Sequence, residues 1–332
     1  MDLSPERGYS GGRAQPAGAR RGSVVVATIE AVQPKARGMT TAPVVAARRR
    51  EVGVLYHPRI DASRDLAAEL VSLIRDRGAE ARLLNAWEER GQLAGRLVGL
   101  DWAVALGGDG TVLRLAGLLA SIGVPVIGVN YGRLGFLAQI DAADARDVIP
   151  RVLAGEGEVE ERLMLRAACN PDALVEGDAG PDHTAPYDAV NDVFVGRGKV
   201  AHAVRMDLAV DGRPLIRFAA DGVIVATPTG STAYSLSAGG PVVAPQMQAV
   251  ILTPVVPHPV PVRTMVLPAT SVIDIRVQTE EQAICSLDGQ RHYAVPNGTT
   301  VRVQAAPYPA RFLRLGTPDQ FYQTLVERLS RW

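Results

Sequence analysis

The chain has 332 residues, enough for two domains of ordinary size, and 47% of them are apolar, so a sizeable core can be buried. Lys and Arg number 35 and so do Asp and Glu, so net charge gives no general affinity for nucleic acid or acidic membranes. Two cysteines, Cys169 and Cys285, are too few for a disulfide framework, and no apolar run reaches the ~18 residues of a membrane span. We therefore expect a cytoplasmic protein that binds neither nucleic acid nor membrane.

Residues 1–50 differ from the rest of the chain, because Gly, Pro, Ala and Arg dominate them. Their apolar runs, such as 24–27, are too short for the core of a signal peptide. We expect a disordered extension, or a start codon assigned too early, with translation beginning at Met1 or at Met39. A basic tail that binds a partner is the alternative, because three arginines at 48–50 end the segment.

From residue 51 onward, strands and helices alternate. Strands are predicted by all-apolar runs at 52–56, 102–106 and 124–129, and a further strand is predicted at 81–84. Helices are predicted by apolar residues at helical spacing over 66–74, 111–122 and 142–153. Strands that are apolar throughout are typical of a parallel sheet covered on both faces. We therefore expect an α/β domain over 51–155, with a parallel, Rossmann-like sheet.

After residue 155 the pattern changes to short β-branched or alternating runs separated by turn signals. These runs lie at 190–195, 204–210, 215–218, 223–226, 271–278, 284–287 and 300–305. Asp211-Gly212 is a hairpin signal between two of them. We expect an all-β sandwich domain over 156–315. A capping box at 317–320, with proline at its first helical position, predicts a C-terminal helix within 316–332 that packs back on the α/β domain.

The most informative motif is Gly107-Gly108-Asp109-Gly110-Thr111, which joins a predicted strand to a predicted helix. Glycines let the backbone approach a phosphate closely, and the start of a helix favours anions through its unpaired N–H groups. Asp109 does not fit a plain phosphate cradle, because its carboxylate repels the ligand unless it binds a metal or takes a proton. The motif indicates a phosphotransfer site, with a turn that only closes the connection as the alternative. It is neither a P-loop nor a Rossmann dinucleotide fingerprint.

A second cluster, 221–241, is rich in Thr, Ser and Gly around one aromatic residue, Tyr234. Hydroxyl groups can bind the polar edges of a sugar or base, and the ring can stack on it. A polar loop entering a short helix, capped by Thr229 or Ser231, is the alternative, but a cap needs only one such residue. The cluster therefore predicts a ligand site.

With these motifs the chain resembles the NAD kinases, which phosphorylate the adenosine-ribose 2′-hydroxyl of NAD to make NADP. Five segments carry the resemblance in order: 107–111, 128–137, 191–192, 221–241 and 288–290. The first motif is shared with phosphofructokinases and with diacylglycerol or sphingosine kinases, whereas the fourth segment is more selective. The resemblance covers the chain from about Val52 to the C-terminal helix.

The resemblance implies a role for each matching position. Asp109 would be the general base that takes the proton from the acceptor hydroxyl as the γ-phosphoryl group of ATP arrives, with Mg²⁺ or another divalent cation on the donor. Contacts to phosphate and ATP are implied for Gly107, Gly108, Gly110 and Thr111. Contacts to NAD are implied for Asp109, Gly110, Asn191, Asp192, His202, Asp221, Thr232, Ala233, Tyr234, Ser235, Leu236, Ser237 and Gln290. No residue is predicted as a direct metal ligand.

Two positions depart from the family pattern. Asp192 stands where the family often has Glu, so its carboxylate reaches less far, and Ala219 stands where an Arg is frequent, so one contact is missing or comes from elsewhere. The resemblance also implies a homo-oligomer, either a dimer or a tetramer. A lipid kinase of the diacylglycerol or sphingosine type and a non-catalytic dinucleotide sensor remain alternatives. The sequence leaves open ATP against polyphosphate as donor, and NAD against NADH as acceptor.

Overall fold

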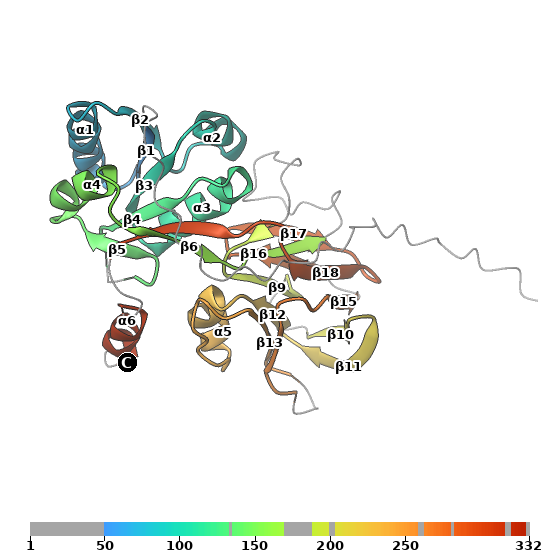
Figure 1. The fold of residues 1–332 in the computed structure, drawn as a ribbon. Coiled ribbons are helices and arrows are strands. Elements are labelled where there is room, and N and C mark those ends of the chain that lie inside the picture. Colours follow the sequence, from blue (N-terminus) through green and yellow to red (C-terminus); the bar gives the residue numbers. More distant parts are fainter. Residues whose placement is uncertain are drawn as a thin grey trace, which may run out of the picture. The chain divides into compact units, whose positions relative to one another are not determined.

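The computed structural model describes residues 50–132, 135–168, 188–198, 203–257, 262–279, 282–315 and 320–329 (Figure 1). The predicted extension, apart from its last residue, therefore lies outside the described residues. The same holds for His202, Cys169 and the first three residues of the predicted capping box. Within the described ranges, no helix has both the length and the apolar character that a membrane span requires.

The first part of the chain forms a mostly parallel sheet in the order β2-β1-β3-β4-β19-β6, with β5 also paired to β4 (Figure 1). Its strands are β1 (Glu51–Tyr56), β2 (Glu80–Asn85), β3 (Trp102–Gly107), β4 (Val126–Asn130), β5 (Ala138–Asp141), β6 (Glu158–Arg162) and β19 (Ala310–Arg314). Only β6 is antiparallel to its neighbour. The helices are α1 (Asp61–Arg75), α2 (Arg90–Leu97), α3 (Asp109–Leu119), which a 3-10 turn (Ala120–Ile122) extends, and α4 (Ala145–Leu153).

Both faces of this sheet are covered, as its all-apolar strands predict. Ala103 and Ala105 of β3 pack into one cluster with α2 and α3, whereas Val104 and Leu106 pack into another with α1 and α4. This alternation follows from the two-residue period of a strand, which sends neighbouring side chains to opposite faces. The predicted α/β fold is confirmed.

Two antiparallel sheets form the second part, in the orders β11-β10-β15-β18-β7-β8 and β14-β13-β12-β9-β16-β17. The first contains β7 (Leu165–Ala168), β8 (Asp188–Ala189), β10 (Val204–Val210), β11 (Arg213–Ala220), β15 (Ile273–Gln278) and β18 (Thr300–Ala305). The second contains β9 (Asp192–Arg197), β12 (Gly222–Ala226), β13 (Ala249–Val255), β14 (Met265–Pro268), β16 (Ala283–Leu287) and β17 (Arg291–Val295). One core cluster takes side chains from both sheets, so they form a sandwich.

Asp211 and Gly212 form the tight turn between β10 and β11, with φ of 51° and 74°. Positive φ at both positions is what a two-residue hairpin turn requires, so this prediction is confirmed. The last helix, α6 (Gln320–Leu329), contacts the α/β part through Phe321, whose ring centre lies 5.8 Å from that of Phe136.

Four elements of the α/β part were not predicted: α2, β5, β6 and β19. Of these, β6 and β19 lie in the sequence range assigned to the second domain, yet both belong to the first sheet. The domain boundaries at 155 and 315 stay a prediction. In the structure, the chain enters the sandwich after β6 and returns to the first sheet at β19.

Candidate active site

The glycine-rich motif forms the connection from β3 to α3. β3 ends at Gly107, Gly108 is extended, and α3 begins at Asp109. The connection lies at the carboxyl edge of the parallel strands, where open α/β sheets bind their ligands. The first N–H groups of α3 are near this turn, as the sequence predicts.

The Asp109 carboxylate is held by three consecutive backbone N–H groups from the segment that leads into β5. Phe136 donates to Oδ2 at 2.9 Å, and Leu137 and Ala138 donate to Oδ1 at 3.1 Å each. Gly135 makes this approach possible, because a Cβ at that position would lie 1.8 Å from Oδ1. The orientation of Asp109 is therefore fixed by the chain itself.

Arg314, a buried cation, binds the segment 136–138 that holds Asp109. Arg314 of β19 donates through Nη1 to the carbonyl of Leu137 at 3.3 Å, and through Nε to Glu160 at 2.8 Å. Burial and the nearby charge of Arg162, opposed by Glu160, lower the pKa of Arg314 to about 10. Arg314 thus stays protonated at neutral pH and ties β19 to the segment that holds Asp109.

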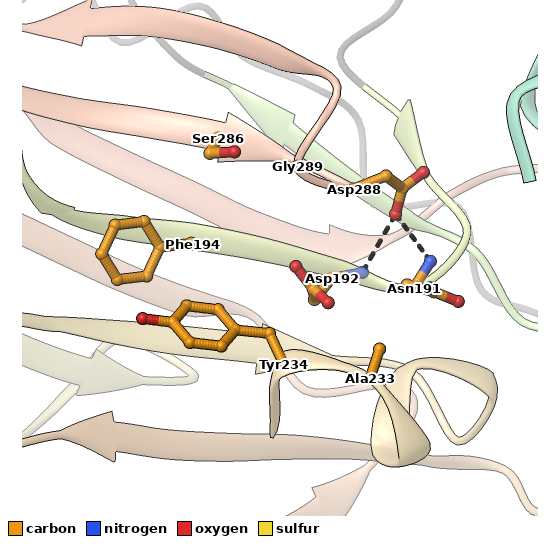
Figure 2. A pocket seen from close by; sticks show the side chains of 8 residues that line it. All are labelled: Asn191, Asp192, Phe194, Ala233, Tyr234, Ser286, Asp288 and Gly289. Atoms are coloured by element: carbon orange, nitrogen blue, oxygen red, sulfur yellow. Dashed lines mark hydrogen bonds between the residues drawn. The ribbon is translucent and has the colours of Figure 1, made fainter. Parts of the chain in front are cut away.

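A pocket of about 320 Å³ opens in the second sheet of the sandwich. Figure 2 shows its lining of Asn191, Asp192, Phe194, Ala233, Tyr234, Ser286, Asp288 and Gly289. The Asp192 side chain points from β9 toward the segment that carries Ala233 and Tyr234 (Figure 2). The rings of Phe194 and Tyr234 lie 5.7 Å apart between centres, and Tyr234 is 44% exposed. The pocket thus combines carboxylates with an accessible aromatic ring.

Asp288 lines this pocket and binds backbone N–H groups of the chain beside it, two of which Figure 2 shows. Its Oδ2 accepts from Val190 N–H at 2.9 Å, and its Oδ1 accepts from Asn191 and Asp192 N–H at 2.7 and 3.1 Å. Burial raises the pKa of Asp288, and the three N–H donors oppose that rise. The arrangement repeats that of Asp109, in which one carboxylate also holds three consecutive N–H groups.

Asp192 is a second buried carboxylate in the pocket, with a side chain close to Asp288. Burial, and to a smaller extent the charge of Asp288, raise the pKa of Asp192 to about 7. Its neighbour Asn191 has a buried Oδ1 that finds no hydrogen-bond partner among the described residues. A buried acceptor without a partner is costly, so it favours a ligand donor at this place.

One hydrogen bond joins the pocket to the glycine-rich turn. Gln290, two residues after Asp288, donates through Nε2 to the carbonyl of Gly110 at 3.2 Å. The structure therefore brings together Asp109, Gly110, Asn191, Asp192 and Gln290, which lie up to 181 residues apart in the chain. Ala233 and Tyr234 join them across the pocket.

Much of the Thr/Ser-rich cluster is used inside the protein rather than in the pocket lining. The Ser231 hydroxyl donates to Pro228 O at 2.6 Å and accepts from Val243 N–H at 3.0 Å. The Ser235 and Thr253 hydroxyls bond to each other at 3.0 Å. Of the other predicted contacts, Thr232 and Leu236 are half-buried and Ser237 is exposed, and none of the three lines the pocket.

Asp221 pairs with Arg197 of β9, with 2.9 Å between Nη2 and Oδ2. Ala219, where the chain departs from the family pattern, is paired across the other sheet with Arg205 of β10. Sequence reasoning also missed Phe194 and Ser286 of the lining. Phe194 lies two residues after Asp192 in β9, so the period of a strand puts both on the same face, whereas Asp288 lies beyond the end of β16 and this period does not link it to Ser286.

The glycine-rich turn can bind phosphate, and the neighbouring pocket can bind a polar molecule. Phosphoryl transfer needs both, so the fold and the site define a kinase. Comparison with known families agrees. Residues 52–157 match the ATP-NAD kinase N-terminal domain, and residues 190–315 match the ATP-NAD kinase C-terminal domain. The chain belongs to the NAD kinase family.

Individual relatives support this assignment over most of the chain. An NAD kinase of Dehalococcoides mccartyi is 34% identical over 281 residues, which is 85% of this chain and 96% of the relative. The crystal structure of yeast NADH kinase complexed with NADH superposes with a TM-score of 0.73 at 25% identity, covering 90% of this chain and 92% of the other. An NAD kinase from Archaeoglobus fulgidus in complex with ATP gives a TM-score of 0.68 at 26% identity, covering 84% and 98%.

Proposed function

We propose that this chain transfers the γ-phosphoryl group of ATP to the adenosine-ribose 2′-hydroxyl of NAD and so forms NADP. The observation that carries the proposal is the Gln290–Gly110 hydrogen bond, because it joins the loop of the polar pocket to the turn that bears Asp109. A phosphoryl donor on the turn and a dinucleotide in the pocket would then meet beside Asp109. Family membership supports both substrates, since the two matching structures carry NADH and ATP.

Asp109 acts in this proposal as the general base. Its carboxylate takes the proton from the 2′-hydroxyl while that oxygen forms a bond to the γ-phosphorus and ADP leaves. Positioning supplies much of the rate in such reactions, and the three N–H groups of 136–138 orient Asp109 without help from substrate. The backbone of Gly107, Gly108 and Gly110, with Thr111, would hold donor phosphates.

The pocket residues bind NAD in this proposal. Asn191 offers a buried acceptor for a hydroxyl or amide, and Asp192 offers a carboxyl group beside it. The half-exposed ring of Tyr234 offers a stacking surface for a base or nicotinamide ring. Ala233 and Gln290 complete the proposed contacts near the pocket. Those of Asp221, Thr232, Ser235, Leu236 and Ser237 rest on the resemblance, and His202 lies outside the described residues.

The proposed cofactor is Mg²⁺, or another divalent cation, which neutralises phosphate charge when it is bound with ATP. Across the part of the chain that the structure describes, no group of three His, Cys, Asp or Glu side chains could hold a metal. Mg²⁺ usually binds through one or two carboxylates together with substrate phosphates. Asp109 is the carboxylate of the glycine-rich turn. We further propose a cytoplasmic homo-oligomer, a dimer or tetramer, which light scattering on the purified chain tests.

The direct test is formation of NADP by the purified chain with ATP, Mg²⁺ and NAD, read by an NADP-specific dehydrogenase. NADH and polyphosphate replace NAD and ATP in parallel reactions, and diacylglycerol and sphingosine serve as lipid acceptors. We expect NADP only when donor, acceptor and Mg²⁺ are all present. Failure to form NADP, beside a characterised NAD kinase that does form it, would refute the proposal. Tight NAD binding without turnover would favour a sensor instead.

A further inference from the structure

Two arginines meet beside the glycine-rich turn. Arg114 lies on α3, four residues after Gly110, and Arg291 begins β17 directly after Gln290. The hydrogen bond between Gln290 and Gly110 brings these two elements together. The two charges are close enough that Arg291 lowers the pKa of Arg114, although burial has the larger effect.

The helix geometry places Arg114 between two contacts with the sandwich. Gly110, Arg114 and Gly117 follow one another at spacings of four and three residues, so they lie on one face of α3. Gly110 contacts Gln290, and a Cβ at Gly117 would lie 3.9 Å from Val190. Arg114 therefore faces the same edge of the sandwich that carries Arg291.

Both guanidinium groups bond to carbonyl oxygens and not to carboxylates. Arg114 donates through Nε to Ala86 O at 3.0 Å and through Nη2 to Glu88 O at 2.8 Å. Arg291 donates through Nη2 to Asp188 O. Among the residues that the structure describes, neither arginine takes part in an ion pair, and each has further N–H groups beyond those that make these bonds.

The acidic side chains around the pair are already engaged. Glu88 pairs with Arg96 at 2.8 Å, and the Glu89 carboxylate accepts from two N–H groups at the start of α2. The Asp188 carboxylate accepts from Arg166 at 2.7 Å and from the Tyr308 hydroxyl. The charge of Glu89 acts on Arg114 and that of Asp288 acts on Arg291, so the repulsion between the two arginines is partly compensated, and an anion between them would lower what remains.

We propose that Arg114 and Arg291 bind the phosphate chain of the donor nucleotide. This inference rests on the proposed function, because it assigns the donor side of the same site. Arg114 stands about 7.5 Å along the α3 axis from Asp109, at a rise of about 1.5 Å per residue, so a phosphate chain whose terminal group reaches Asp109 can extend past both arginines. Guanidinium groups suit this role, since they bind phosphate oxygens with two N–H groups at once.

The test measures KM for ATP and KM for NAD separately in Arg114→Gln and Arg291→Gln. Loss of a charge-assisted contact to phosphate is expected to raise KM for ATP roughly tenfold to a hundredfold in each variant, with KM for NAD unchanged. Arg82→Gln is the matched control, because Arg82 also donates to two backbone carbonyls, those of Arg96 and Val98, but pairs with Glu51. Its KM values should equal those of the unaltered chain.

A second measurement separates phosphate from nucleobase. Inorganic tripolyphosphate should compete with ATP, and its inhibition constant should rise in both arginine variants in parallel with KM for ATP. An unchanged inhibition constant would overturn the assignment to phosphate. Equal rises in KM for ATP and NAD would also overturn it, because they indicate a general loosening of the site.

Fluorescence of Trp87 can report the binding of phosphate at Arg114. The ring of Trp87 is 43% exposed, and its centre lies 5.2 Å from the Arg114 guanidinium carbon. Binding of tripolyphosphate should change its emission, and Trp87→Phe should abolish the change. If the emission of the unaltered chain does not respond to tripolyphosphate, Arg114 does not bind phosphate. If the unaltered chain forms NADP but fails these tests, this inference falls and the proposed function stands; if it forms none, the proposed function itself falls.

Discussion

Asp192→Asn should make the protein more stable at alkaline pH. The pKa of Asp192 is about 7 in the folded protein against an ordinary value of 3.8, because the carboxyl group is buried and lies near Asp288. The folded state therefore holds the proton more tightly than the unfolded chain. It follows that the free energy of unfolding falls as pH rises from about 4 to about 7.

The size of the effect follows from the same two pKa values. At a pH above both of them, the buried charge of Asp192 costs up to about 4 kcal/mol relative to the unfolded chain. Asparagine has nearly the same shape and cannot ionise, so the variant escapes this cost. Any change in packing or hydrogen bonding adds an offset that does not depend on pH.

Thermal melting of the unaltered chain and the Asp192→Asn variant at pH values from 5 to 8 provides the assay. The advantage of the variant should widen by about 3 kcal/mol across this range, equivalent to roughly 5–10 °C in Tm. Asp144→Asn is the control, because Asp144 is exposed and its variant should follow the unaltered chain at every pH. A constant difference in Tm from pH 5 to pH 8 would refute the reasoning about burial and charge.

Two further variants test the carboxylates that hold backbone N–H groups. Gly135→Ala places a methyl group where the Asp109 carboxylate lies, and a displaced base should lower kcat by roughly a hundredfold. Gly132→Ala in the same segment meets nothing closer than 3.9 Å and should keep normal kcat; equal rates in the two variants would contradict the role of Gly135. Asp288→Asn leaves at least one of three backbone N–H groups without an acceptor, so it should lower the free energy of unfolding by about 1–3 kcal/mol and raise KM for NAD. An unchanged Tm would show that the hydrogen bonds of Asp288 do not contribute to the stability of the fold.

The predicted gain in stability for Asp192→Asn carries an expected functional cost. The proposed NAD contact needs a carboxylate at this position, so the variant should have a higher KM for NAD while it melts at a higher temperature. A site that keeps a buried charge at the expense of stability is a common compromise in enzymes.

The sequence alone predicted most of the regular elements of the fold, because local signals were strong. The all-apolar runs in β1, β3 and β4 are typical of buried strands between two layers of helices. Elements with weak signals were missed. The α2 sequence carries two glycines and buries only Leu93 and Leu97, and β6 reads Glu-Val-Glu-Glu-Arg, which is too charged to suggest a strand. Its pairing with β19, about 150 residues later, is a tertiary contact that no local pattern contains.

The candidate site, too, could be predicted from the sequence only in part. Glycine spacing and the resemblance identified Asp109, but its three N–H donors come from a segment 27 residues later and could not be read from the motif. The hydroxyl density of the Thr/Ser-rich cluster suggested many ligand contacts, yet Ser231 and Ser235 are buried in internal hydrogen bonds. Hydroxyl groups serve backbone and ligand equally well, so composition cannot distinguish these two uses.

The central claim is that Asp109 takes the proton during phosphoryl transfer to NAD, and Asp109→Asn tests it most directly. The amide cannot accept that proton, so kcat for NADP formation should fall by roughly a hundredfold or more. The dissociation constant for NAD, measured by calorimetry on the same preparation, should stay close to that of the unaltered chain. An Asp109→Asn variant that turns over at the normal rate would contradict the account.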